Sequence, residues 1–526
     1  MADDPILSLL DELRCLLGPD GLVTDRDAAA WMTQDIWAAG APPLAVAAPV
    51  DTDQLSACLR LAAGAGAGVP VLPRGGGLSY TGGYSGPADA LLIDTRRMNR
   101  ILRLDPVDMV VTVQAGCTWA ALRDALTPLG LRTPFWGPLS GLSSTIGGGV
   151  SQNNAFFGAG TYGTTAESVV GLTVVTVDGT ILSLGTGMVP GRPTYRHFGP
   201  DLAGLFCGDT GALAVKAEVT LRLIPAPAET GSVSFALPDG PSLLRGMSGL
   251  SRAGIGAEVF GFDPALTAVR LRRAGLAGDL RTLGNVLGGQ GSWTKGLAAA
   301  AKVVTAGRSH LEEAGHNLHV IVDGRSRAAV QADLDAARRL VSGEGGREIE
   351  NAVPTIVRSQ PFTAPTSILG PAGERWVPVH GIVAHSRAPA CLAEIEGIFA
   401  DRAGEMAAHG VTRGCLTTTL STNGLLIEPV FYWPEERLAV HEHLLDPAHL
   451  AKLPRHGANP AATALVADLR RAVVAVFRRH GAAHFQVGRC YPLADAIAPE
   501  ALALLAAVKR HLDPHSRLNP GALGLP

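Results

Sequence analysis

The chain has 526 residues, more than a single hydrophobic core usually holds, so we expect two or three domains. Hydrophobic residues make up 47% of the chain and charged residues 17%, which is typical of a well-packed globular protein and excludes a disordered one. A net charge of −3 argues against a nucleic-acid partner, and seven dispersed cysteines without a CxxC pair argue against a disulfide framework or a zinc site.

The N-terminal stretch MADDPILSLLDELRCLLG begins with acidic residues and predicts an amphipathic helix, not the basic start of a signal peptide. No apolar run reaches the roughly 18 residues that a membrane span needs. We therefore expect a soluble, cytoplasmic protein with no membrane span.

Short strands and helices alternate through the first part of the chain. A strand is predicted at residues 44–50, and the helix after it opens at Asp51 or Thr52. Asp51 and Gln54 have the spacing of a capping box. A second short strand, 69–73, leads into a glycine-rich loop. Further strands are predicted in ALLIDT, ILRLD, MVVTVQAG and ALAVKAEVTLRLIPAP, and a helix in WAALRDALTPLG. In VVGLTVVTVDGTILSLG, the Asp-Gly pair at 178–179 predicts two strands joined by a type I′ turn.

Longer mixed segments begin near residue 228. They include a helix, SRAAVQADLDAARRLVSG, and a strand, NLHVIVDG, and they predict a second α+β domain that extends to about residue 480. The last stretch predicts a strand from His484, a helix in PEALALLAAVKRHL and a proline-glycine end.

Two glycine-dense loops stand out. VLPRGGGLSYTGG, residues 71–83, follows a predicted strand, but no helix starts after it as a dinucleotide-binding Rossmann turn would require. The second, WGPLSGLSSTIGGGVSQNNAFFGAGTYGTT, lies about 70 residues downstream. Ordering two such loops costs much backbone entropy, and their bare N–H groups suit an anion. A pyrophosphate with a long flat ring attached fits two loops of this kind.

Four stretches carry a family resemblance: PRGGGLSYTGG; SSTIGGGVSQNNAFFGAGTYGTTAESVVGLTVVTVDG; GPDLAGLFCGDTGALAVKAEVTLRL; and HLDPHSRLNPGALG. In this order they resemble the signatures of the vanillyl-alcohol oxidase/p-cresol methylhydroxylase (PCMH-type) flavoprotein superfamily, most of all its glycolate oxidase and D-lactate dehydrogenase branch. The resemblance covers residues 40–225 and the last 45 residues well, and the region between them loosely.

The resemblance implies an α+β fold: an FAD-binding domain of two subdomains (1–228), an α+β cap over the flavin (229–480) and a C-terminal segment that returns to the FAD domain (481–526). It assigns residues to FAD along the chain: Arg74, Gly75, Gly76, Gly77 and Ser79 at the pyrophosphate; Pro138, Ser144, Thr145, Gly147, Gly148, Ser151 and Asn153 along the pyrophosphate, ribityl chain and flavin; Gly160, Tyr162 and Gly163 near the ring; Val169 and Val174 near the adenosine; and Asn519 by the flavin or its ribityl chain.

Some relatives bind FAD covalently through a histidine after the first glycine run, or through a cysteine before the second. This chain has Leu78 and Ser143 at those places. We therefore expect non-covalent FAD, with attachment through a cap histidine or tyrosine left open.

Oxidation of an alcohol carbon by FAD needs a base for the hydroxyl proton, and a carboxylate or phenolate substrate needs an arginine. We rank His380 first as base and Arg489 first as substrate anchor, followed by Tyr432 and Glu428, with His484 as a further candidate. On a strand, Glu428 and Tyr432 share a face.

Side chains alternate between the two faces of a strand, which leads to a second expectation. His484 and Arg489 would lie on opposite faces, so a bulge or bend at Gly488 would be needed to bring both into one site. His441 and His443 are predicted on a solvated helix face.

Relatives that oxidise 2-hydroxy acids often carry HVGDGNLH, which binds a divalent metal. The string is absent here, and HGIVAHS has different spacing, so no metal is predicted.

The expected substrate is a small molecule, either a hydroxy acid or an aromatic alcohol. Alternatives are a phenol oxidase of the vanillyl-alcohol oxidase type, a flavin subunit that passes electrons to a cytochrome or quinone, and a flavin-binding protein without catalysis. The acceptor (oxygen, cytochrome or quinone) is left open. Dimers are common in this superfamily, and a homodimer is one expected state.

Overall fold

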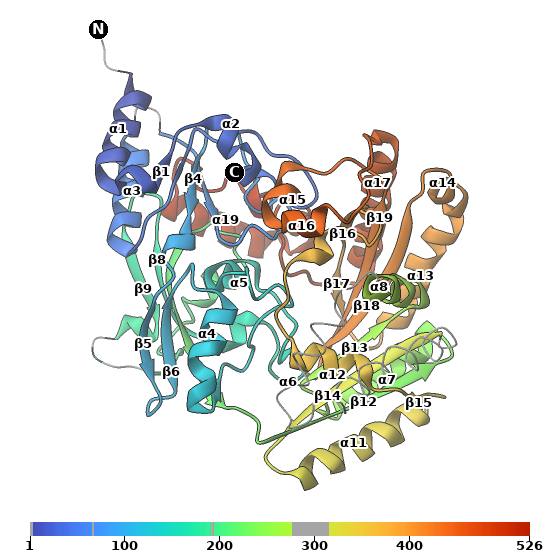
Figure 1. The fold of residues 1–526 in the computed structure, drawn as a ribbon. Helices are drawn as coiled ribbons and strands as arrows, with labels where there is room; N and C mark the ends of the chain where they lie inside the picture. The colour runs from blue at the N-terminus through green and yellow to red at the C-terminus, as the bar shows by residue number, and fades with distance from the viewer. Residues whose placement is uncertain (1–3, 66–67, 190, 192–193, 276–314) are drawn as a thin grey trace.

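The structure is a computed structural model that describes residues 4–65, 68–189, 191, 194–275 and 315–526. Three principal β-sheets organise it (Figure 1). The first two lie side by side in the N-terminal part of the chain. The third, with the helices on it, forms a separate body that we call the cap.

The first sheet has the order β1 (Leu22–Val23), β2 (Ala45–Ala47), β4 (Leu91–Asp94) and β3 (Val71–Arg74). Strands β2, β4 and β3 are parallel, and α1 (Pro5–Leu17) and α3 (Thr52–Gly64) bury their apolar faces against them. Helix α3 begins where the spacing predicted, because the Asp51 carboxylate accepts a hydrogen bond from the Gln54 N–H at 2.9 Å.

The second sheet is antiparallel, with the order β5 (Ile101–Asp105), β6 (Val110–Gln114), β10 (Val215–Arg222), β8 (Val169–Val175) and β9 (Ile181–Gly185). Apolar residues of α4 (Trp119–Leu126) and α5 (Ile146–Gln152) pack in the same core. The β8–β9 hairpin is present, but the type I′ prediction is wrong. Gly179 has φ +84°, whereas Asp178 is not left-handed, and its side chain instead accepts a hydrogen bond from the Thr180 N–H at 3.0 Å.

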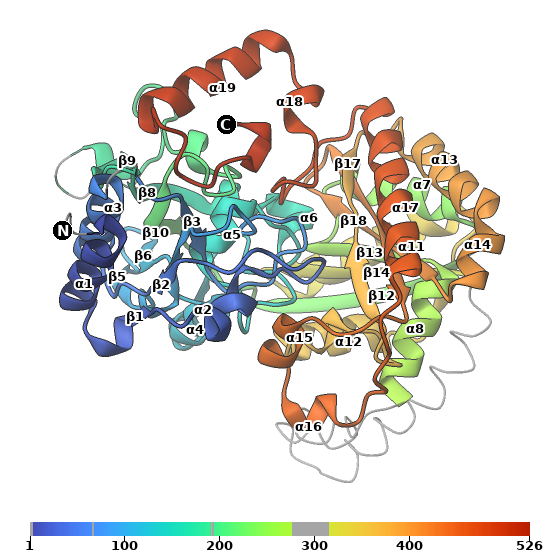
Figure 2. The same ribbon diagram turned by 90° about the horizontal axis from the view of Figure 1, so that it is seen from above.

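The cap sheet runs β15 (Arg347–Ile349), β12 (Glu229–Leu237), β14 (His316–Gly324), β13 (Glu258–Phe262), β18 (Thr412–Leu420), β19 (Gly424–Trp433) and β16 (Arg375–Pro378), and β17 (Gly381–Val383) also pairs with β19. Figures 1 and 2 show helices α7 (Gly240–Arg252), α11 (Arg327–Ser342), α13 (Ala388–Asp401) and α17 (Pro460–Arg479) against its outer side.

The alternation along β19 gives the two faces of the cap sheet different roles. Phe431 and Trp433 pack in the core under the helices, whereas Val430 and Tyr432 share a core with residues of the second sheet. The inner face of the cap, which includes Glu428, is therefore turned toward the N-terminal sheets.

The chain ends against the first sheet. After α19 (Pro499–Leu512), Leu518 forms a bridge with Val71 of β3. Lys509 is buried and donates to the Ala212 and Leu518 carbonyls and to the Asp513 carboxylate, at 2.6–2.9 Å. Among the described residues, no helix combines the length and apolar character that a bilayer crossing requires.

Candidate cofactor and substrate site

A cavity lies where the loop after β3 meets the start of α5. It is lined by eleven of the residues predicted to bind FAD: Arg74, Gly75, Gly76, Gly77, Ser79, Pro138, Ser144, Thr145, Gly147, Gly148 and Ser151. The two glycine loops are about 70 residues apart in the chain, and together they line one cavity.

The first loop needs glycines because the second passes directly over it. A Cβ on Gly75 would overlap the Thr145 hydroxyl, and a Cβ on Gly76 would overlap the Ser143 carbonyl oxygen. Thr145 is itself fixed, since its hydroxyl accepts a hydrogen bond from the Gly148 N–H at 3.2 Å. The close approach leaves backbone groups of both loops facing the cavity.

The cavity also contains an unmatched positive charge. Arg74 is 1% exposed, and its Nε and Nη2 atoms have no hydrogen-bond partner among the described residues. Burial lowers the pKa of its guanidinium. A buried, unpartnered guanidinium beside bare glycine backbone fits the pyrophosphate of a dinucleotide.

Seven further residues predicted to bind FAD do not line this cavity: Asn153, Gly160, Tyr162, Gly163, Val169, Val174 and Asn519. Val169 and Val174 are buried in the core around β8. The Asn519 amide donates to the Gly83 and Thr210 carbonyls at 2.8 and 2.7 Å. Their contacts with a cofactor stay predictions.

Sequence reasoning missed a second set of lining residues: Tyr80, Tyr84, Gln152, Asn154, Thr210, Lys216 and Gln486, among others. Five of these seven lie inside the four stretches that carry the family resemblance, so their neighbours could have indicated them. Gln486 carries no local signal, because only the fold brings it to the cavity.

Tyr80 and Gln486 join the cavity to the inner face of the cap. The Gln486 amide donates to the Tyr80 hydroxyl at 3.1 Å. The Tyr80 ring meets Trp376 and His380 edge-on, with centroid distances of 5.9 and 6.3 Å. Burial raises the pKa of Tyr80 well above its ordinary value, so its hydroxyl stays protonated.

His380 is fully buried in this cap cluster and both of its ring nitrogens are engaged. Nε2 donates to the Phe485 carbonyl at 2.7 Å, and Nδ1 accepts from the Tyr491 hydroxyl at 3.1 Å. Burial lowers the pKa of His380 to about 3, so the ring is neutral. This arrangement leaves neither nitrogen free to take a proton, and we do not retain His380 as the base.

Glu428 extends from β19 to the same cluster. Its Oε2 lies 4.0 Å from His380 Nδ1, and its side chain is 13% exposed. Burial raises the pKa of Glu428 from 4.5 to about 8, and the Arg270 charge opposes the shift only in part. Tyr432, four residues further along β19, is buried on the same face opposite Trp376 of β16.

The Arg489 guanidinium is hydrogen-bonded to groups outside the cluster around Glu428. It donates to the Gly82 carbonyl, and to the Asn519 side chain and the Pro520 carbonyl at 2.7 Å each. It ties the C-terminal segment to the first glycine loop, and it does not point to the cluster around Glu428.

The strand predicted from His484 is wrong, since this segment is irregular. Gln486 and Gly488 have φ of 51° and 56°, and the resulting bend brings the His484 ring onto Tyr491, at 4.0 Å and 14°. His484 Nδ1 donates to the His380 carbonyl at 2.7 Å. The bend expected at Gly488 therefore exists, but it directs His484 and Arg489 to different places.

The solvated-face prediction also fails for one histidine of α15 (Ala439–Leu444). His441 is buried, and its Nδ1 accepts from the Leu438 N–H at 3.0 Å, whereas His443 is exposed. Within the described part of the chain, no three His, Cys, Asp or Glu side chains are grouped as metal ligands would be.

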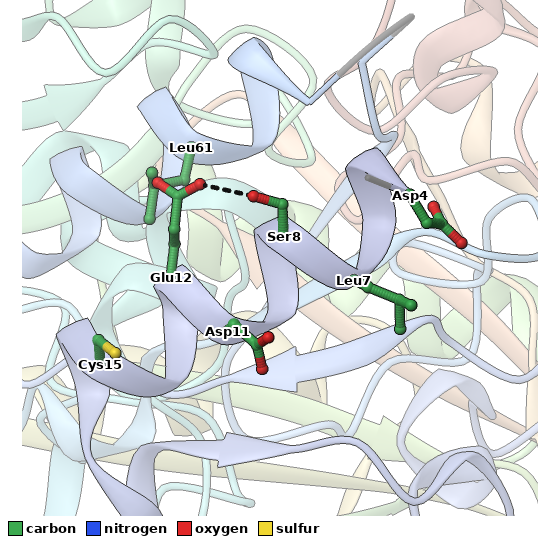
Figure 3. A pocket seen from close by; sticks show the side chains of 7 residues that line it. All are labelled: Asp4, Leu7, Ser8, Asp11, Glu12, Cys15 and Leu61. Carbon is green, nitrogen blue, oxygen red and sulfur yellow. Dashed lines mark hydrogen bonds between the residues drawn. The ribbon is translucent and has the colours of Figure 1, made fainter. Parts of the chain in front are cut away.

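A separate hollow runs along α1, far from the glycine loops. Figure 3 shows the seven residues that line it: Asp4, Leu7, Ser8, Asp11, Glu12, Cys15 and Leu61. It is an acidic surface feature that shares no residue with the cavity.

Comparison with known proteins identifies the site. Residues 43–185 match the FAD binding domain model, and residues 491–523 match that of the FAD linked oxidases, C-terminal domain. The resemblance to FAD-binding oxidoreductases is thus confirmed for these two segments, and the first of them contains both glycine loops. FAD is the cofactor that these domains indicate.

Curated relatives share about a third of their residues with the matched part of this chain. The glycolate oxidase subunit GlcD of Bacillus subtilis is 34% identical over 195 residues, 37% of this chain and 40% of GlcD. The D-2-hydroxyglutarate dehydrogenase of Xanthomonas citri pv. viticola is 33% identical over 229 residues, 43% of this chain and 47% of that enzyme. The matches thus span less than half the length of these relatives.

Solved structures match over the whole chain at low identity. The p-cresol methylhydroxylase structure with substrate bound has a TM-score of 0.74 and 16% identity, and covers 100% of this chain and 98% of that one. The 4-ethylphenol oxidase of Gulosibacter chungangensis has a TM-score of 0.72 at 16% identity, with the same coverage. The predicted α+β, PCMH-type fold is confirmed.

Proposed function

We propose that this protein is an FAD-dependent oxidoreductase that takes a hydride from the alcohol carbon of a small molecule. The observation that carries the proposal is Glu428, a desolvated carboxyl on the inner face of the cap, in a cluster continuous with the FAD cavity through Tyr80 and Gln486.

Bound FAD would supply the hydride acceptor. The chain must then accept the proton that the substrate hydroxyl loses. Glu428 would do so in its ionised form, and its raised pKa of about 8 makes it a stronger base than an ordinary carboxylate. His380 cannot compete for that proton, because both its nitrogens are hydrogen-bonded within the protein.

Tyr80 would orient the substrate oxygen. Its hydroxyl oxygen accepts a hydrogen bond from Gln486, which directs its own O–H proton away from that amide and makes it available as a donor. Tyr491 is held differently, since its hydroxyl donates to His380 Nδ1. Of the two tyrosines we assign the substrate-facing role to Tyr80.

The walls of the cluster favour an aromatic alcohol over a small hydroxy acid. Tyr80, Trp376 and Tyr432 offer ring faces and edges. Arg270 supports a hydroxy acid as the second candidate: its guanidinium lies 4.2 Å from the Phe262 ring centroid and acts electrostatically on Glu428. A substrate carboxylate would meet this cation.

We propose that the FAD is bound without a covalent link. Leu78 lines the cavity where a histidine would attach the flavin, and it has no nucleophilic atom. Ser143 stands where a second attachment would need a cysteine, and its carbonyl oxygen already packs against Gly76.

The test is anaerobic bleaching of the visible flavin band of the purified holoprotein by a panel of compounds: benzyl alcohol, 4-hydroxybenzyl alcohol, p-cresol, glycolate, D-lactate and D-2-hydroxyglutarate. Bleaching by the benzylic alcohols supports the leading function, and bleaching by the hydroxy acids alone supports the second. Bleaching by p-cresol alone favours a phenol oxidase. No bleaching by any member, with FAD bound, would overturn the proposal.

A further inference from the structure

Arg74 is a buried charge that the protein itself leaves unbalanced. It ends β3, it is 1% exposed, and its Nε and Nη2 atoms have no hydrogen-bond partner within the part of the chain that the structure describes. Nη1 donates to the Gly75 carbonyl at 3.4 Å. Asp94, which acts on Arg74 electrostatically, is itself paired with the Arg96 guanidinium, and no ion pair of Arg74 occurs among the described residues. Burying such a charge is costly unless an anion comes to it.

Two aromatic rings hold this guanidinium in place. Its Cζ lies 5.0 Å from the Trp31 ring centroid and 5.5 Å from that of Tyr84. The bare Gly77 leaves the space for it, because a Cβ there would overlap the guanidinium. Arg74 is therefore fixed against the glycine loop that lines the cavity.

The stack continues into the cap. The other partner of Trp31 is His443 of α15, whose ring is parallel to it at 4.4 Å and 7°. His443 is oriented by its own helix, since Nδ1 donates to the Ala439 carbonyl at 2.9 Å. A second contact joins α15 to the N-terminal part of the chain: the Val440 N–H donates to the Gln34 side chain at 3.1 Å. Tyr84, Arg74, Trp31 and His443 form one column from the FAD cavity to the surface of the cap.

We infer that the Arg74 side chain, and not only the backbone around it, binds the FAD pyrophosphate, and that Trp31 and His443 position it for this contact. His443 is a positioning residue that lies outside the cavity lining, so a cap residue controls affinity for the cofactor. The inference rests on FAD binding alone and survives if the proposed substrate chemistry fails.

The first test uses Arg74→Met, with Arg14→Met, an exposed arginine of α1, as the control. FAD affinity is measured by titrating apoprotein with FAD and following flavin fluorescence, and apoprotein stability is measured by urea unfolding. Loss of a charge-assisted contact should raise the Kd for FAD about 10- to 100-fold. The apoprotein should be at least as stable as wild type, because an unbalanced buried charge has been removed. Arg14→Met should bind FAD like wild type.

These two readouts move in opposite directions, which a merely structural arginine would not produce. If Arg74→Met loses apoprotein stability and FAD affinity together, Arg74 supports the fold and the inference is overturned. An unchanged Kd would overturn it as well.

The second test uses His443→Ala and His443→Phe, with the exposed His511→Ala as control. Removing one aromatic partner should raise the Kd for FAD about 3-fold, and phenylalanine should restore it, since it keeps the ring but not the hydrogen bond to Ala439. If alanine and phenylalanine behave alike, His443 does not position Arg74.

Discussion

Glu428→Gln is the substitution that tests the proposed chemistry most directly, because glutamine keeps the shape of the side chain and removes its ability to accept a proton. A positioned general base contributes about 10²- to 10⁴-fold to rate. We therefore expect the rate of anaerobic flavin reduction by the best substrate of the panel to fall by that factor. Glu396→Gln, a carboxyl on α13 paired with Arg413, is the matched control and should react like wild type.

The raised pKa fixes the pH dependence of the same reaction. Because Glu428 must be ionised to accept the proton, wild-type kcat/KM should rise with pH through about 8. The residual rate of Glu428→Gln should lack this step. A wild-type profile without a step near this pH, or a variant that reacts within a few-fold of wild type, would refute the assignment of Glu428 as base.

Stability gives an independent measure of the same pKa. A carboxyl whose pKa is raised from 4.5 to about 8 on folding binds more protons in the folded state between these values, so its contribution to stability is complete below pH 4.5 and is lost as pH rises to 8. The full shift corresponds to about 5 kcal/mol. In urea unfolding of the apoprotein, the free energy of unfolding of Glu428→Gln relative to that of wild type should increase by at least about 2 kcal/mol as the pH rises between these values. A difference that does not change with pH would contradict the desolvated carboxyl.

Four other outcomes are expected from the structure. Acid precipitation should release the flavin into the supernatant, and colour in the pellet would contradict non-covalent binding. Gly76→Ala should weaken FAD binding at least about 10-fold in a fluorescence titration, because its Cβ would overlap the Ser143 carbonyl oxygen. Arg489→Met should lower the unfolding temperature by loosening the C-terminal segment while the KM for substrate stays unchanged, and a raised KM at unchanged stability would restore Arg489 as an anchor. Lys509→Met should cost about 3–5 kcal/mol in urea unfolding, because it leaves the buried Asp513 carboxylate without its partner.

Much of the fold could be predicted because its signals are local. Helix α3 starts at Asp51 because one side chain caps it, and the glycine loops are recognisable because close backbone approach requires glycine. The β8–β9 turn shows the limit of such signals. The Asp-Gly pair marks the hairpin correctly, but the turn type was decided by the Asp178 side chain bonding to Thr180.

The site depends on contacts that no local pattern contains. Gln486 meets Tyr80 across more than 400 positions of the chain, and Tyr491 meets His380 across 111. Arg489 looked like a substrate anchor because it is an arginine near His484 in sequence. The bend at Gly488 separates the two. Glycine is needed there for both its left-handed φ and its close approach to Thr81, whose carbonyl oxygen a Cβ would overlap.

The choice between His380 and Glu428 shows why residue type alone is a poor guide to a base. Histidine has the more suitable intrinsic pKa, and on that ground it ranks first. Burial acts on the two side chains in opposite directions: it lowers the pKa of the histidine to about 3 and raises that of the carboxyl to about 8. The same desolvated pocket is therefore the reason for proposing Glu428, which ranked below His380, as the base. Strand alternation, which the sequence does contain, placed Glu428 on one face with Tyr432, but only the fold shows that this face is turned toward the N-terminal sheets.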